Sequence, residues 1–449
     1  MPKILTFDLG TTLFKLAVFV LRGNLLGLRR VHPPIEHPRA GTWEMAVESF
    51  FSCLRGGIRE LRTQFDLSDV SAISFASQAN SFTLLDAADR PLCPLILWPD
   101  DRAIGQTAAM QRAAGRAALR QQTGIPRMSH QFAAAKLLQL RGETPSLFRD
   151  RPRLMFISDL LTWWLTRQHV CEGGIAGLSG AADIHALRWR DEALEELGFG
   201  SLRLPTITRA GRDVGAIDPA AADELSLPRA CRFVVGSLDQ YAGAIGTGSV
   251  RAGRVTETTG TVLAAVRCAR VIRQDAPPEV FAGPSFDPEL YFEMSFSSTA
   301  ANLLEHYRNS LPDRPDFSEL MSLAEHATAG ELRIEPLGEG EAIDRCFRHV
   351  TAQHSPGQVV RAILECVAAQ LAGQIRSLCD REMPSRIASA GGGARSDLWL
   401  RIKQDMLGVP FRATVCEEPT SLGAAILAGS AVLGKSVPAL AEEWVAFRE

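Results

Sequence analysis

The feature that most constrains the fold is an arrangement of strand, turn and strand that occurs twice in the chain. Residues 4–20 form two apolar runs joined by the turn Asp8–Thr12, and residues 254–266 repeat this order with Thr and Gly again in the turn. Each such hairpin can begin a sheet, so the repeat predicts two domains of one architecture with a cleft between them. We expect these domains to span residues 1–243 and 244–449.

The composition narrows the class of protein. The 449 residues are 46% hydrophobic and 22% charged, and apolar runs alternate with amphipathic helical spacing, as in residues 43–65, which favours an α/β fold. A net charge of −3 gives no electrostatic reason to expect nucleic acid or an anionic membrane as a partner. The nine cysteines form no C-x-x-C pair, and neither a signal peptide nor an uncharged stretch of ~20 residues is evident. We therefore expect a cytoplasmic protein.

The first motif that could carry chemistry is Asp8-Leu9-Gly10-Thr11-Thr12, followed by Lys15. A carboxylate at a strand end can hold Mg²⁺, while a tight glycine turn offers hydroxyl and backbone N–H groups to phosphate oxygens. Lys15 could add positive charge or point to solvent. The alternative is an ordinary hairpin turn, so the motif alone does not decide between the two.

Two further glycine-containing turns lie in the second half. Glu257–Thr261 resembles the first turn, and two such turns could grip a polyphosphate from both sides of a cleft. Gly391–Gly393 precedes a helix whose N-terminus carries partial positive charge, where a flat or anionic group could approach the backbone. A flexible strand-to-helix turn is the competing interpretation. The spacing is neither G-x-G-x-x-G nor that of a P-loop.

Asp239 follows a strand and opens a helix rich in Ala and Gly. A carboxylate at this place could accept a proton from a substrate hydroxyl, but it could equally cap the helix. Two polar loops are weaker candidates for binding a hydroxylated ligand. They are Ser77–Ser81 and Trp98–Arg102, and an internal Asp–Arg pair is an alternative for the second.

Taken together, the segments resemble the FGGY family of carbohydrate kinases, a branch of the actin/hexokinase/Hsp70-like superfamily. The resemblance is collinear and covers nearly the whole chain. Its matching segments are Asp8–Lys15, Ile73–Asp86 with Pro91–Arg102, Asp239-Gln240, Gly260-Thr261, Gly391–Trp399 and Gly423–Ala425.

The resemblance implies two ribonuclease-H-like domains that close around ATP, Mg²⁺ and a sugar, with Asp239 as the base that takes the acceptor proton. Asp8 would also be the metal ligand. The residues that it places at the nucleotide are Asp8, Gly10, Thr11, Thr12, Lys15, Gly260, Thr261, Ala301, Glu305, Gly392, Gly393 and Asp397. Those that it places at the sugar are Gln78, Ala79, Asn80, Trp98, Asp100, Asp239 and Gln240.

The chain also departs from the family pattern. Ala79-Asn80 replaces the usual residues of the sugar loop, Pro336–Glu341 lacks the family's Arg, and His349 stands where glycine is expected. We expect a kinase acting on a small sugar, most plausibly a ketopentose such as xylulose or ribulose, or on a polyol. The alternative is a catalytically silent sensor that binds a sugar or nucleotide. The family also suggests a homodimer.

Overall fold

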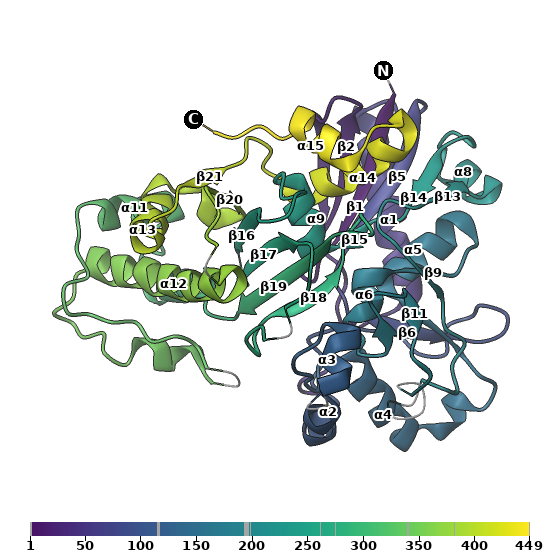
Figure 1. The fold of residues 1–449 in the computed structure, drawn as a ribbon, viewed down its shortest axis with the longest axis horizontal. Coiled ribbons are helices and arrows are strands. Elements are labelled where there is room, and N and C mark those ends of the chain that lie inside the picture. The colour runs from purple at the N-terminus through teal and green to yellow at the C-terminus, as the bar shows by residue number, and fades with distance from the viewer. Residues whose placement is uncertain are drawn as a thin grey trace.

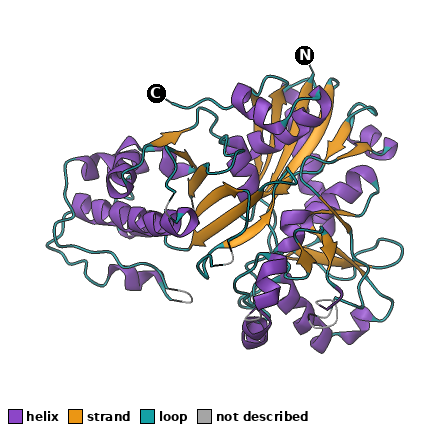
Figure 2. Cartoon of the chain, viewed as in Figure 1, coloured by secondary structure: helices purple, strands orange, loops and turns teal. Residues whose placement is uncertain are grey.

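The computed structural model describes residues 2–114, 117–192, 197, 199–260, 262–273, 275–338, 341–380 and 382–448. Two mixed sheets dominate it, and most helices lie on their outer faces (Figures 1 and 2). The first sheet has the order β13-β14-β5-β1-β2-β3, with β15 paired to β5. Its strands are β13 (Asp213–Ala216), β14 (Arg232–Val234), β5 (Val70–Ser77), β1 (Lys3–Leu9), β2 (Phe14–Val20), β3 (Leu25–Val31) and β15 (Ser237–Leu238).

The second sheet has the order β18-β19-β17-β16-β20-β21 and repeats the central part of the first. β16 pairs antiparallel with β17 and parallel with β20, just as β1 pairs antiparallel with β2 and parallel with β5. The sequence repeat therefore corresponds to a structural repeat. The strands are β18 (Phe281–Pro284), β19 (Tyr291–Ser297), β17 (Leu263–Ala269), β16 (Val255–Thr259), β20 (Ile387–Ala390) and β21 (Phe411–Ala413).

Helices of the C-terminal half divide between the two sheets. α12 (Pro356–Cys379) and α13 (Asp397–Leu407) pack on the second sheet, and α10 (Asn302–Ser310) and α11 (Phe317–Glu325) pack on α12. The last helices, α14 (Pro419–Leu433) and α15 (Val437–Trp444), return to the N-terminal strands, and α14 packs on β5 and β1 (Figure 1). The apolar core of the first sheet thus contains residues from both sides of residue 243. The domain boundary expected at residue 243 remains a prediction.

Helix α9 (Asp239–Gly246) links the two halves, because it contacts β5 of the first sheet and β16 and β17 of the second. It crosses α14 at a pair of glycines. A Cβ on Gly246 would lie 1.7 Å from the Pro419 carbonyl oxygen, and one on Gly423 would lie 1.9 Å from that of Ala242. Only glycine permits this close approach of the two backbones.

A smaller layer of strands and helices covers one end of the first sheet. Its strands are β4 (Glu44–Met45), β7 (Leu95–Ile96), β6 (Phe82–Leu85), β8 (Arg153–Phe156), β9 (Val170–Glu172), β10 (Ala182–Asp183), β11 (Arg188–Trp189) and β12 (Thr206–Thr208). The remaining helices of the first half belong to this layer or pack on the outer side of the first sheet. They are α1 (Val47–Gln64), α2 (Thr107–Ala114), α3 (Ala117–Thr123), α4 (Ala133–Glu143), α5 (Ile157–Thr166), α6 (Gly173–Gly177) and α8 (Pro219–Leu225).

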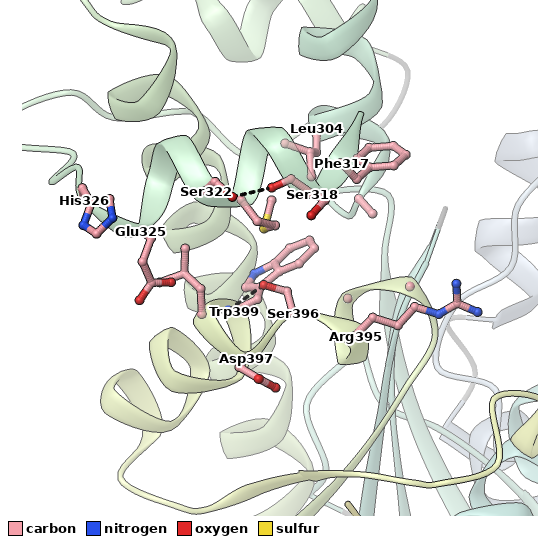
Figure 3. Close-up of a pocket in the computed structure, with 15 residues that line it drawn as sticks. Leu304, Phe317, Ser318, Ser322, Glu325, His326, Arg395, Ser396, Asp397 and Trp399 are labelled. Atoms are coloured by element: carbon pink, nitrogen blue, oxygen red, sulfur yellow. Dashed lines mark hydrogen bonds between the residues drawn. The ribbon is translucent and has the colours of Figure 1, made fainter. Parts of the chain in front are cut away.

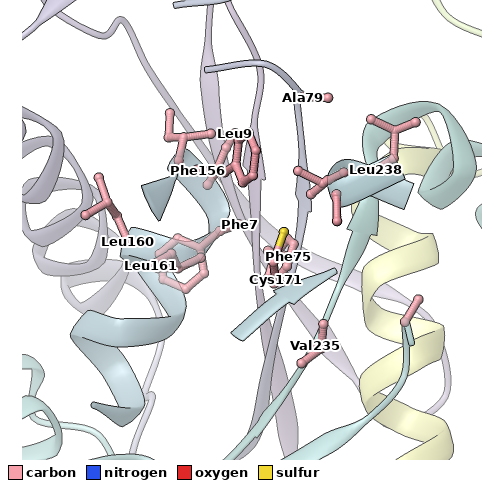
Figure 4. Close-up of a cluster of buried hydrophobic side chains, with 14 of the residues drawn as sticks. Phe7, Leu9, Phe75, Ala79, Phe156, Leu160, Leu161, Cys171, Val235 and Leu238 are labelled. Carbon is pink, nitrogen blue, oxygen red and sulfur yellow. The ribbon is translucent and has the colours of Figure 1, made fainter. Parts of the chain in front are cut away.

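The core beneath this layer is strongly apolar. Phe7 of β1 and Phe75 of β5 are buried in the same apolar cluster as Phe156 and Leu160 from the covering layer (Figure 4). This packing fixes the ends of β1 and β5, where the loops with polar side chains begin. No helix within the described residues is long and apolar enough to span a membrane.

Candidate active site

Two cavities lie near the predicted site residues. One, of about 470 Å³, is lined by Asp239, Gln240, Gln78 and Trp98 from the first half and by Phe281 from the second sheet. We call it the Asp239 cavity. The other, of about 840 Å³, is lined by Gly392, Gly393, Asp397, Ala301, Phe317 and Trp399. We call it the Gly392 cavity.

Asp8 lies at the end of β1, directly opposite Lys15 of β2 in the antiparallel register. The Lys15 ammonium is 3.3 Å from the Asp8 carboxylate and 2.9 Å from that of Glu418, which also pairs with Arg30. Burial raises the pKa of Asp8, although Lys15 opposes this shift. Burial works to lower the pKa of Lys15, but the two carboxylates outweigh it and raise the pKa overall. Lys15 is thus charged and points toward Asp8.

The first glycine turn follows. A Cβ on Gly10 would lie 2.8 Å from the Leu13 carbonyl oxygen, so the tight turn requires glycine. Thr12 is exposed. Thr11, expected at the phosphates, lines the Asp239 cavity instead, where its hydroxyl accepts a 2.6 Å hydrogen bond from the Trp98 indole N–H.

Asp239 is the first residue of α9 and faces the cavity. The N-cap position belongs to Leu238, and one Asp239 oxygen accepts only the N–H of the next residue, Gln240, at 2.7 Å. Burial, with a smaller contribution from the negative charge of Asp8, raises the pKa of Asp239 to about 7. A carboxylate with a pKa near neutrality is suited to accept a proton.

Glu172, which the sequence analysis did not single out, supports the start of α9. Its buried carboxylate accepts N–H groups of Gly174 at 2.8 Å, Ile175 at 3.1 Å and Leu238 at 3.3 Å. Burial raises the pKa of Glu172 to about 7 despite these hydrogen bonds. The Gly-Gly pair after Glu172 is the only sequence signal of this capping role.

Gln78 and Trp98 form one hydrogen-bonded wall of the Asp239 cavity. The Gln78 amide donates to the Gly10 carbonyl at 3.2 Å, and its oxygen accepts from Ser81 at 2.9 Å. Ser81 in turn accepts the backbone N–H of Trp98 at 2.9 Å. Hydrogen bonds therefore join the first glycine turn to the loop Ser77–Ser81 and to Trp98.

Lys136 of α4, also missed in the sequence, lies beneath this wall. It is fully buried, and its ammonium donates to the carbonyls of Leu97 at 2.7 Å and Trp98 at 2.8 Å. Burial lowers the pKa of Lys136 to about 7. This lysine fixes the backbone that carries the Trp98 indole.

Of two residues expected at the sugar, Asn80 lines the Asp239 cavity and Asp100 does not. Asn80 lines the cavity with φ of 61°, and its side-chain oxygen accepts the N–H of Ala133 at 2.9 Å, at the start of α4. Ala79 and Gln240 line the cavity too. Asp100, expected at the sugar, is not among the lining residues. Its fully buried carboxylate binds Arg102 at 2.7 Å and the Trp43 N–H at 2.7 Å, because an unpaired charge there would be costly.

The Gly392 cavity lies between α11 and the start of α13 (Figure 3). Gly391 has φ of 79°, and a Cβ on Gly393 would lie 2.7 Å from the Thr259 side chain. The glycines thus form a bare cradle beside the N-terminus of α13, which suits a nucleotide. Ala301 and Asp397 line the cavity, but Glu305 is exposed and does not. Phe317 and Ser322 of α11 also line it, although no sequence motif indicated them.

Described residues of the segment that holds the second Thr/Gly turn adjoin both cavities. The Gly260 carbonyl accepts the N–H of Ala301 at 3.0 Å, while Val262 lines the Asp239 cavity. Thr259 contacts the glycine cradle. Thr261, predicted at the phosphates, lies outside the described residues, as do Glu339 and Gly340 of the segment Pro336–Glu341. A molecule extending from the glycine cradle toward Asp239 would pass this turn.

Candidate metal ligands are few. Within the described ranges, no group of three or more His, Cys, Asp and Glu side chains is placed to hold a metal ion. Asp8 nevertheless lies beside the first glycine turn, and its negative charge contributes to the raised pKa of Asp239. A carboxylate at such a turn fits a Mg²⁺ ion that completes its shell with water and phosphate oxygens.

Solved structures share this fold. The ligand-bound xylulose kinase from Lactobacillus acidophilus superimposes with a TM-score of 0.88 at 20% identity, over 100% of this chain and 93% of that one. The protein therefore has the two-domain fold of the actin-like ATPases, and the predicted α/β fold class is confirmed.

Residues 3–246 match the N-terminal domain of the FGGY family of carbohydrate kinases, and residues 255–432 match its C-terminal domain. The chain belongs to this family and is a sugar phosphotransferase, as the resemblance predicted. Its similarity extends to xylulose kinase of Staphylococcus epidermidis, 26% identical over 95% of this chain and 87% of that protein. It is also similar to gluconokinase of Bacillus subtilis, 23% identical over 94% of this chain and 86% of that protein.

Proposed function

We propose that the protein transfers the γ-phosphoryl group of ATP to a hydroxyl of a small sugar, a ketopentose such as xylulose or ribulose, or of a polyol. The observation that carries this proposal is that Gly260 and Val262, two described residues between β16 and β17, adjoin different cavities. Val262 lines the Asp239 cavity, and the Gly260 carbonyl binds Ala301, which lines the Gly392 cavity. ATP in the glycine cradle would extend its phosphates past these residues toward an acceptor at Asp239.

In this proposal the protein contributes positioning and electrostatics. The acceptor is held by the polar wall of Gln78, Asn80 and Trp98, and Asp239 takes the proton from the reacting hydroxyl. Lys15 places positive charge at the first turn, where the transferred phosphoryl group needs it. Asp8 would hold Mg²⁺, which when bound neutralises phosphate charge.

The relatives leave the acceptor open, because a xylulose kinase and a gluconokinase are both similar to this chain. The retained carboxylates and glycine turns favour an active kinase over a silent sensor. The unusual pair Ala79-Asn80 does not weaken this view, since Asn80 has a structural role at the start of α4.

The test is ADP release with a panel of ketopentoses, polyols and aldonates, measured for the wild type and for Asp239→Asn. We expect robust turnover with at least one acceptor and a loss of at least about 1,000-fold in the variant, with ATP affinity retained. Asp223→Asn, at an exposed surface position, is the matched control. Wild-type turnover by the Asp239 variant would refute the base assignment, and binding without turnover would favour the sensor.

A further inference from the structure

The Asp239 cavity has two chemically different walls. The wall from the first half offers hydrogen-bonding groups, including Gln78, Asn80 and Asp239. The wall from the second sheet is apolar throughout its described residues. It consists of Val262, Ala264, Phe281, Met294 and Phe296, and we call it the apolar wall.

The apolar wall is a built feature of the sheet. Phe281 of β18 pairs directly with Met294 of β19, and Ala264 of β17 pairs with Phe296 of β19. Residues directly opposite one another share a face, so these four side chains point to one side. Glu293, which precedes Met294 in β19, points to the other side and lines a different cavity. The wall is therefore fixed by strand register.

The wall also presents an aromatic surface to the cavity. The rings of Phe281 and Phe296 lie 5.1 Å apart between centroids, with their planes at 32°. Phe281 is 2% exposed, whereas Phe296 is 39% exposed, which is unusual for a side chain of this size. The exposed ring is available to a bound molecule.

A fully hydroxylated acceptor would place some of its hydroxyl groups against this wall. A hydroxyl that leaves water without a new hydrogen-bond partner is penalised, whereas a methyl group in the same place is favoured. We infer that the preferred acceptor is a deoxy or methyl-bearing polyhydroxy ketone or polyol. Its apolar end contacts the apolar wall and its reacting hydroxyl lies at Asp239. This inference rests on the proposed function.

A competing explanation is that the apolar wall only seals the cleft. It faces the apolar side chains of Phe132 and Leu178 from the other half of the chain, and these could meet it when the cleft closes. A seal would affect all acceptors alike, whereas a specificity wall would discriminate between a hydroxyl and a methyl group at one position.

Two pairs of acceptors test this difference: D-xylulose with 1-deoxy-D-xylulose, and D-ribulose with 1-deoxy-D-ribulose. Each pair differs by a single hydroxyl. We expect kcat/KM to be at least tenfold higher for the deoxy member of at least one pair, mainly through KM. Calorimetric binding of the same compounds without ATP should show the same preference.

Variants of the apolar wall then test whether its side chains cause the preference for the deoxy acceptor. Met294→Gln keeps the side-chain length but adds an amide, and Phe296→Gln changes a partly exposed residue that folding does not require to be buried. Both should bring the deoxy preference toward unity. Met383→Gln, at a position 37% exposed and outside the cavity, is the control and should leave it unchanged.

The outcomes separate the inference from the proposed function. Equal use of both members of each pair, preference for the hydroxylated member, or no binding of either deoxy compound would overturn the inference, even if the protein is an active kinase. Equal losses with all acceptors in both variants would show a seal. Binding that favours the deoxy compounds without ADP release would support the wall and contradict the proposed phosphoryl transfer.

Discussion

At the scale of single residues, the site is built from buried ionisable groups that are destabilised in their charged forms. Asp239 and Glu172 both have pKa values raised to about 7, and that of Lys136 is lowered to about 7. Such groups are costly for folding, and they are retained where chemistry or positioning requires them.

Asp239→Asn should stabilise the protein above neutral pH. The carboxyl has a pKa of about 7 when folded and about 3.8 when unfolded, so between these values the folded state holds a proton that the unfolded state has lost. The unfolding free energy of the wild type therefore falls as pH rises through this window. We expect the variant to be more stable at pH 8 by on the order of 2 kcal/mol, and nearly equal to the wild type near pH 4.

Urea unfolding at pH 4, 6 and 8 measures this effect. Asp223→Asn, which changes an exposed carboxylate, controls for the loss of one surface charge. If Asp239→Asn showed the same stability difference from the wild type at all three pH values, Asp239 would not titrate near neutrality.

Lys136→Met should weaken acceptor binding. The change removes the buried Lys136 donor from the Trp98 carbonyl, and leaves the Leu97 carbonyl with the Asp100 N–H as its donor, and so loosens the Trp98 indole. We expect the acceptor KM to rise about tenfold, corresponding to about 1.4 kcal/mol, with kcat changed much less. Steady-state kinetics measure this split, with Lys435→Met at the surface as the control. An unchanged KM would argue that the Trp98 backbone is held by other contacts.

At the scale of elements, the crossing of α9 and α14 ties the site to the C-terminal segment. α9 carries Asp239 at its start, and α14 begins next to Glu418, which holds Lys15. A shift of either helix would move charges at the first glycine turn. The crossing therefore supports the site, although Gly246 and Gly423 line neither the Asp239 cavity nor the Gly392 cavity.

Gly423→Ala should be strongly destabilising for this reason. The added methyl group would lie 1.9 Å from the Ala242 carbonyl oxygen, so the helices would have to separate. We expect a loss of about 2–4 kcal/mol in unfolding free energy and a lower kcat. Gly373→Ala in α12 is the matched control, because nothing lies within 4 Å of its Cβ position. It should stabilise the protein by about 0.5–1 kcal/mol.

Thermal and denaturant unfolding of both variants give the comparison. A Gly423 variant as stable as the Gly373 variant would mean that the two helices do not approach as closely in solution.

At the scale of the whole molecule, each cavity belongs to a different part of the cleft. The Asp239 cavity takes its walls from both sheets, while the Gly392 cavity is built on the second sheet and its helices. Domains that share a ligand close around it when both partners are present, because the contacts are then made by both walls.

The radius of gyration should therefore decrease when a non-hydrolysable ATP analogue and an acceptor are added together. Small-angle X-ray scattering of the apo, singly and doubly liganded protein measures this change. We expect the smallest value with both ligands and an intermediate value with the analogue alone. A radius that is the same in all states would contradict closure.

The sequence predicted the fold class, and its motifs led to Asp239, Gln78 and the glycine cradle, because these depend on short segments with local turn chemistry. For Asp100 it left two roles open, a sugar contact or an internal ion pair, and only the structure shows that the carboxylate pairs with Arg102. It also missed Lys136 and Phe317, since a lysine or phenylalanine in an amphipathic helix carries no sign of what lies opposite.

By itself, the sequence determined the duplicated strand–turn–strand plan and the order of the glycine-containing turns, since neighbouring residues specify turns and strands. Only the tertiary structure decided that α14 returns to the first sheet, that Glu418 meets Lys15, and that the apolar wall faces Asp239. These features join residues far apart in the chain. Their contacts follow from the packing of whole sheets and helices, which no local pattern encodes.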